Sequence, residues 1–288
     1  MRPLRCIISA TAALEEYDMK TRILASAVLL PLLLLIVLAA PKIYTAILFG
    51  LMAAIAAYEL LNGTGLVKHP RLCVYSMVSA FWCVLWCSLH IGYQWLLLGI
   101  LIFWVALFAE MMASDMKLGF DKIACCLAGG VFVPLLLGSL VRIHGGQQGR
   151  FFILVPFVMA FLSDTGAYFA GLRFGKHKLA PTISPKKTVE GVVGGVVGAI
   201  VGMLLYCLVL SLFFKMQMNY LAAVVYGALG SVAAVFGDLC FSVIKRQTGI
   251  KDYGNLIPGH GGILDRFDSM MVVGPLAELL LLLLPLTV

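Results

Sequence analysis

Long apolar runs, each close to the length of a membrane span, alternate with short polar segments along most of the chain. A helix crosses the hydrocarbon core of a bilayer in about 20 residues. Helices are expected because an isolated strand would leave backbone groups unsatisfied in lipid. The pattern therefore predicts an all-α, polytopic integral membrane protein with about nine transmembrane helices. The predicted ranges are 22–40, 43–62, 72–89, 94–112, 123–141, 151–172, 190–213, 219–243 and 269–286.

The composition agrees with a chain that lies mostly in a membrane. Hydrophobic residues make up 62% of it and charged residues 12%, whereas an average soluble domain has about 25% charged residues. The spans and their short connections occupy nearly all 288 residues, so residues 19–288 are expected to form a single transmembrane domain. Residues 1–18 are polar and precede a natural start at Met19, and we expect them to be an N-terminal extension.

Positive charge is distributed unevenly between the two ends of the predicted spans. With a cytoplasmic N-terminus, 17 of the 21 lysines and arginines fall in cytoplasmic segments. Because this bias sets the orientation of membrane proteins, we expect the N-terminus in the cytoplasm and the C-terminus outside. The membrane that we expect the chain to span is the inner (cytoplasmic) membrane of a bacterium. The net charge of +7 is spread between apolar spans, so nucleic acid is not an expected partner.

Five carboxylates lie inside apolar runs, where a charged side chain is costly and usually functional. Glu59, Glu110 and Glu278 lie near predicted span ends, and we interpret them as carboxylates that reach the headgroup region. Asp164 and Asp238 are surrounded by glycine and polar residues. We predict that these two belong to a functional site.

The richest stretch begins at Asp238. On a helix, Asp238, Ser242 and Lys245 stand at positions i, i+4 and i+7, which places them on one face. Arg246 lies beside them. A carboxylate, a hydroxyl and an ammonium along one stripe suit a divalent cation at one end and phosphate oxygens at the other.

Residues 247–269 are predicted to form a loop because they are rich in glycine and proline. Glycines let backbone N–H groups approach anionic oxygens and form an anion-binding nest. With Lys251, His260 and Arg266 in the same segment, the loop is a candidate polyphosphate site.

Two further carboxylates begin the last predicted span. Asp265 and Asp268 lie three residues apart, on one side of the incoming helix. We expect them to reach the same inner surface as Asp238 and to help bind a metal ion.

Residues 191–198 contain glycines at four-residue spacing, in the pairs Gly191–Gly195 and Gly194–Gly198. Small residues at this spacing let membrane helices approach closely. We therefore expect helix packing here rather than nucleotide binding.

Residues 242–268 resemble the signature of CDP-diacylglycerol synthases, also called phosphatidate cytidylyltransferases. That signature runs Ser-x-x-Lys-Arg, four residues, Lys-Asp, a glycine-bearing loop, His-Gly-Gly and Asp-Arg-x-Asp. Its fixed positions are met by Ser242, Lys245, Arg246, Lys251, Asp252, His260, Gly261, Gly262, Asp265, Arg266 and Asp268. A second block, residues 163–191, is similar to the same family. The catalytic signature is placed at 237–268, and the resemblance covers roughly residues 19–288.

The resemblance implies transfer of the cytidylyl group of CTP to phosphatidic acid, giving pyrophosphate and CDP-diacylglycerol, the activated precursor for phospholipid synthesis. It implies Mg²⁺ as cofactor, with a second cation as a further option. It also implies membrane lipids as partners, and it is compatible with a homodimer. The implied catalytic residues are Asp238, Lys245, Arg246, His260, Asp265 and Arg266. The implied substrate-binding residues are Ser242, Lys251, Gly261, Gly262, Lys186, Lys187 and Asp164. The implied metal ligands are Asp238, Asp265 and Asp268.

Two alternatives remain. A CTP-dependent kinase acting on a polyprenol-type lipid would use the same nucleotide but transfer the γ-phosphoryl group. An anion transporter would also carry acidic residues within its spans. Inverted repeats in the two halves of the chain would favour transport, and we find no such symmetry in the sequence.

Overall fold

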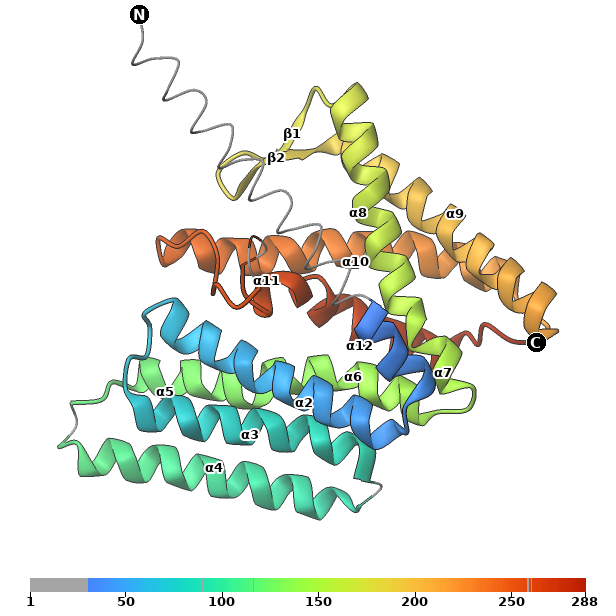
Figure 1. The fold of residues 1–288 in the computed structure, drawn as a ribbon. Helices are drawn as coiled ribbons and strands as arrows, with labels where there is room; N and C mark the ends of the chain where they lie inside the picture. The colour runs from blue at the N-terminus through green and yellow to red at the C-terminus, as the bar shows by residue number, and fades with distance from the viewer. Residues whose placement is uncertain (1–30, 90, 116, 258, 260) are drawn as a thin grey trace, which may run out of the picture.

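The computed structural model describes residues 31–89, 91–115, 117–257, 259 and 261–288, and it consists of long helices with one small hairpin (Figure 1). The elements, in chain order, are α2 (Lys42–Tyr58), η1 (Glu59–Gly63), α3 (Pro70–Leu89), α4 (Tyr93–Ala113), α5 (Phe120–Leu127), η2 (Ala128–Phe132), α6 (Val133–Gly145), α7 (Gly149–Phe152), α8 (Leu154–Phe174), β1 (Lys178–Ala180), β2 (Ser184–Thr188), α9 (Val189–Phe214), α10 (Tyr220–Gln247), α11 (Leu264–Phe267) and α12 (Met270–Leu283). Both η1 and η2 are single π-helical turns.

The predicted all-α membrane architecture is confirmed. Within the described residues, seven helical segments are long and apolar enough to cross a membrane. They are Lys42–Gly63, Pro70–Leu89, Tyr93–Ala113, Phe120–Gly145, Gly149–Phe174, Val189–Phe214 and Tyr220–Gln247. Each coincides with one predicted span, because a run of apolar residues in lipid has no favourable alternative to a helix.

The first and last predicted spans differ from these seven. Of the span predicted at 22–40, the described part is helical over 31–39; the remainder, like the expected extension 1–18, lies outside the described residues. The last span, predicted at 269–286, is the 14-residue helix α12. At 1.5 Å per residue α12 is about 21 Å long, shorter than a hydrocarbon core of about 30 Å. The chain leaves the helix at Leu284, directly before Pro285, as expected from the restriction that proline places on the preceding residue.

The helices form two groups that α10 and α12 connect. In Figure 1, α2, α3, α4 and the α5–α6 segment lie side by side, while α8 and α9 form an antiparallel pair that runs at a steep angle to them. Helix α12 packs against α6 in the first group and against α8 and α10. The segment between α10 and α12, which carries α11, therefore lies where the two groups meet.

The glycines of α9 serve helix packing, as predicted. A Cβ added to Gly166 of α8 would lie 2.4 Å from the carbonyl oxygen of Gly194, and one added to Gly198 would lie 2.7 Å from the carbonyl oxygen of Leu162. No side chain fits at these separations, so the glycines set how closely α8 and α9 approach.

The basic loop between α8 and α9 folds as an antiparallel hairpin in which Lys178 pairs with Thr188 and Ala180 with Ser184. The segment 184–188, which contains the implied substrate-binding residues Lys186 and Lys187, is therefore strand β2, and the turn precedes it. The Nε–H of Arg246, at the end of α10, donates to the carbonyl oxygen of Ile183 at 3.2 Å. This bond holds the hairpin against the end of α10.

Candidate active site

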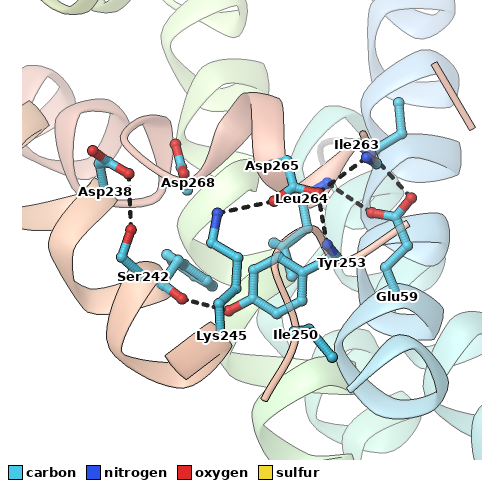
Figure 2. A network of polar contacts seen from close by, with 12 residues as sticks. Glu59, Asp238, Ser242, Lys245, Ile250, Tyr253, Ile263, Leu264, Asp265 and Asp268 are labelled. Atoms are coloured by element: carbon cyan, nitrogen blue, oxygen red, sulfur yellow. Dashed lines mark hydrogen bonds and ion pairs between the residues drawn. The ribbon is translucent and has the colours of Figure 1, made fainter. Parts of the chain in front are cut away.

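The polar stripe predicted on α10 is present. Asp238, Ser242 and Lys245 follow one another along one face of the helix, as Figure 2 shows. The hydroxyl of Ser242 donates to Oδ1 of Asp238 at 3.3 Å. The spacing of these residues was sufficient for this prediction, because it depends only on the helical repeat.

Lys245 points toward the segment that follows α10, and Figure 2 shows its ammonium between Asp265 and Asp268. Its Nζ lies 2.9 Å from Oδ1 of Asp265, and the two side chains are only 10% and 1% exposed. Oδ2 of Asp265 accepts the backbone N–H groups of Tyr253 and Gly262 at 2.7 and 3.0 Å. Both oxygens of Asp265 are thus engaged by the protein itself.

Tyr253 completes this cluster, and nothing in the sequence analysis singled it out. Its side chain is 2% exposed, and its hydroxyl donates to the carbonyl oxygen of Phe241 at 2.8 Å. The Nζ of Lys245 lies 5.4 Å from the centre of its ring, within the range of a cation–π contact. Tyr253 therefore anchors the loop to α10 beside the ion pair.

A second cluster surrounds Asp238. Oδ2 of Asp238 forms an ion pair with Nζ of Lys187, which strand β2 supplies. The carboxyl group of Asp268 lies beside Asp238 and is buried (Figure 2). Burial, reinforced by the negative charge of Asp238, raises the pKa of Asp268 above its usual range. Asp164 and Arg266 lie close enough to this cluster to interact with it electrostatically.

The structure does not bring the three predicted metal ligands together. Within the described part of the chain, no three His, Cys, Asp or Glu side chains converge on a point that could hold a metal ion. Asp265 is committed to Lys245 and to backbone N–H groups, which leaves Asp238 and Asp268 as neighbours. Mg²⁺ is commonly held by one or two carboxylates, with substrate phosphates and water completing the octahedron. Two adjacent carboxylates fit such an ion.

A cavity of about 540 Å³ opens beside Asp268. Apolar side chains form most of its wall, while Asp164, Asp265, Arg266 and Asp268 supply charge. The apolar residues come from the helix at 31–39, from α2, α8 and α12, and from the segment after α10; they are Leu32, Leu33, Ile36, Leu48, Met52, Phe157, Phe161, Ile257, Ile263, Phe267 and Met270. The cavity suits a molecule with an apolar part and a charged headgroup.

The remaining predicted phosphate ligands differ in how accessible they are. Lys186, Arg246, Lys251 and Arg266 are exposed, and Arg266 lies at the cavity. His260 lies outside the described residues. Gly261 has a φ of +86°, which favours glycine, and the next N–H, that of Gly262, donates to Asp265. The N–H of Gly262 is thus already hydrogen-bonded to a side chain of the protein.

The interpretation of Glu59 as a carboxylate in the headgroup region was wrong. Glu59 is 5% exposed and accepts the N–H groups of Ile263 and Leu264. Its position within an apolar run, where a buried acid needs a partner, was the signal that could have identified it.

The other two acids that received the same interpretation form ion pairs. Oε1 of Glu110 lies 3.2 Å from Nη1 of Arg71, and Glu278 forms a bidentate pair with Arg142 in which each bond is 2.7 Å long. These pairs tie α4 to α3 and α12 to α6, and neither belongs to the cluster around Asp238.

The profile of the Cytidylyltransferase family matches residues 20–284, which is nearly the whole chain. The chain belongs to this family. Among curated proteins, the phosphatidate cytidylyltransferase of Staphylococcus epidermidis strain RP62A is 35% identical over 268 residues, covering 92% of this chain and 99% of that protein. The phosphatidate cytidylyltransferase of Staphylococcus aureus strain COL is 38% identical over 174 residues, covering 59% of this chain and 63% of that protein.

Membership of the cytidylyltransferase family confirms the resemblance that the signature indicated. In this cytidylyltransferase the signature runs from the end of α10 through α11, and both ion pairs and one wall of the cavity lie along it. The polar residues are thus gathered at the junction of the two helix groups, where the cavity opens.

Proposed function

We propose that this membrane enzyme transfers the cytidylyl group of CTP to phosphatidic acid, giving CDP-diacylglycerol and pyrophosphate. The observation that carries the proposal is the cavity, in which an apolar wall continues directly into Asp164, Asp265, Arg266 and Asp268. A diacyl lipid has the same division into an apolar part and a charged headgroup, and its phosphate would be held by Arg266 and by a cation bound to the aspartates. The full-length similarity to phosphatidate cytidylyltransferases supports this substrate.

In the proposed reaction, a phosphate oxygen of the lipid attacks the α-phosphorus of CTP. The bond between the α-phosphorus and the bridging oxygen breaks, and pyrophosphate leaves with the electron pair. The lipid phosphate is itself the nucleophile, so the step needs no covalent enzyme intermediate. Its main obstacle is the mutual repulsion of two anions, which positioned cations reduce.

The chain's own basic residues are suited to reduce that repulsion. Arg266 lies at the cavity and would hold the lipid phosphate, while the exposed Lys186, Arg246 and Lys251 would hold the phosphates of CTP. Lys245 is paired with Asp265 and would present a fixed positive charge beside them. His260, as part of the signature, would hydrogen-bond a phosphate.

Asp238 and Asp268 would hold a magnesium ion. A bound Mg²⁺ supplies charge neutralisation on phosphate oxygens. Lys187 pairs with Asp238 and would exchange this contact for a substrate phosphate when the cation binds. Ser242 keeps Asp238 in place through its hydroxyl. Asp265, the third predicted ligand, would instead serve as the partner of Lys245.

The label transferred from CTP distinguishes this function from its nearest alternative. We expect purified enzyme with phosphatidic acid and Mg²⁺ to incorporate label from [α-³²P]CTP into lipid and none from [γ-³²P]CTP. A lipid kinase acting on polyprenol would give the opposite result with its own acceptor. Release of labelled pyrophosphate from [γ-³²P]CTP in step with lipid labelling is the internal control.

We further propose that the site faces the cytoplasm of a bacterial cell, with the N-terminus on the same side, because CTP is cytoplasmic and 17 of the 21 basic residues favour that orientation. In a background lacking the eight native cysteines, we expect Asn255→Cys to react with an impermeant maleimide only from the cytoplasmic side. Gln147→Cys, which is exposed in the α6–α7 connection, is the matched control and is expected to react only from outside. Labelling of Asn255→Cys from outside alone would reverse the orientation.

A further inference from the structure

Glu59 connects α2 to the signature segment across more than 200 positions of sequence. Its Oε1 accepts the N–H of Ile263 at 3.0 Å, and its Oε2 accepts the N–H of Leu264 at 2.8 Å (Figure 2). Hydrogen bonds to an ionised acceptor are stronger than neutral ones. The residue after Leu264 is Asp265, which pairs with Lys245. The carboxylate of Glu59 is thus bonded to the backbone one residue before the ion pair of the site.

Two glycines of the signature segment make room for this carboxylate. A Cβ on Gly254 would lie 2.6 Å from Oε1 of Glu59, and a Cβ on Gly262 would lie 2.4 Å from the same atom. Neither glycine has a positive φ, so the backbone conformation alone would accept alanine at both positions. Their small size is required because Glu59 occupies the space beside them.

The end of α2 is shaped to deliver Glu59 to this place. Glu59 begins η1, a π-helical turn, and such turns often mark functional positions because they redirect side chains. At the other end of η1, a Cβ on Gly63 would lie 2.1 Å from the carbonyl oxygen of Tyr253. The turn that ends α2 therefore contacts the signature segment closely at two points, at Ile263–Leu264 and at Tyr253, both of which precede Asp265 in the chain.

We infer that Glu59 is a positioning residue for the cytidylyl transfer: its carboxylate holds the backbone of Ile263 and Leu264 so that Asp265 meets Lys245 and Asp268 meets Asp238. The inference rests on the proposed function for the reaction it serves. It also gives Gly254 and Gly262 a different role from the anion-binding nest predicted from sequence, because the anion that they accommodate is the protein's own carboxylate.

The first test replaces Glu59 by Gln, which keeps the shape but presents an NH₂ group to one of the two N–H donors. We expect kcat per folded enzyme to fall about 10- to 100-fold, as the loss of charge-assisted bonds to buried donors predicts. We also expect the magnesium concentration for half-maximal rate to rise, because Asp268 follows the same segment. A purely structural role would lower the yield of folded protein and leave both quantities unchanged.

Glu110→Gln is the matched control, since the partners of Glu110 within the described part of the chain, Arg71 and His69, lie outside the site. We expect it to keep the kcat and the magnesium dependence of the unmodified enzyme. If Glu59→Gln does not give folded protein, Glu59→Asp, which keeps the charge on a shorter side chain, is measured in the same way.

A double-mutant cycle tests whether Gly262 is small because of Glu59. Gly262→Ala alone is expected to lower kcat about tenfold, because its methyl group displaces the carboxylate from its bonds. In the Glu59→Ala background, where the space is free, the same change is expected to cost less than about twofold. Equal costs in both backgrounds would overturn the inference.

The outcomes separate this inference from the proposed function. If the unmodified enzyme makes no CDP-diacylglycerol, the proposed function fails. If it does, and Glu59→Gln retains its kcat and magnesium dependence, the positioning role alone is overturned.

Discussion

Replacing Asp265 by Asn is expected to remove both activity and much of the thermal stability. The change leaves the ammonium of Lys245 buried without a charged partner, and breaking one side of a buried ion pair costs about 3–5 kcal/mol. For a chain of this size, that corresponds to a fall of about 10 °C in the melting temperature. Turnover should drop at least about 1000-fold, because Lys245 and the segment around Tyr253 lose their common anchor. Melting in detergent and the labelled-CTP assay measure the two effects.

Asp121→Asn is the control for this substitution, since it makes the same chemical change at an exposed position at the start of α5. It should leave melting and turnover unchanged. Should Asp265→Asn melt with the unmodified protein and lose activity alone, Asp265 would act on substrate or metal instead of holding Lys245.

Replacing Asp238 by Asn is expected to abolish turnover without loss of stability. The side chain of Asp238 is 33% exposed, and an ion pair with that much exposure contributes little to folding. The expected loss in kcat is at least about 1000-fold, because a metal ligand stabilises transition-state charge by several kcal/mol. The melting temperature should stay within about 2 °C of the unmodified value.

Magnesium gives a second measurement for Asp238. A ligand that binds only the folded state raises the melting temperature, so Mg²⁺ with CTP should stabilise the unmodified protein and fail to stabilise Asp238→Asn. Near-normal turnover of Asp238→Asn at ordinary magnesium concentrations would remove Asp238 from the metal site.

The features that the sequence predicted correctly depend on local periodicity. The seven long helices follow from runs of apolar residues, and the stripe of Asp238, Ser242 and Lys245 follows from the repeat of one helix. The close approach of α8 and α9 follows from four-residue glycine spacing. Each of these needs only residues that are near one another in the chain.

The features that sequence could not give depend on distant contacts. Asp265 was predicted to be a metal ligand beside Asp238, whereas in the structure it pairs with Lys245 and accepts the Gly262 N–H that follows the left-handed turn at Gly261. The pairing of Lys187 with Asp238 requires the hairpin to fold back over α10. The partners of Glu59 lie more than 200 residues away, so its spacing in sequence carries no sign of them.

The hydrogen bonds of Glu59 and Asp265 bear on whether the lipid or a water molecule accepts the cytidylyl group. Together they accept four backbone N–H groups, that of Tyr253 and those of the consecutive residues Gly262, Ile263 and Leu264. A polar backbone that is solvated in this way by fixed carboxylates does not need water molecules to satisfy it. With the phosphates bound beside this segment, as proposed, fewer waters compete with the lipid for the α-phosphorus, and we expect little hydrolysis of CTP to CMP.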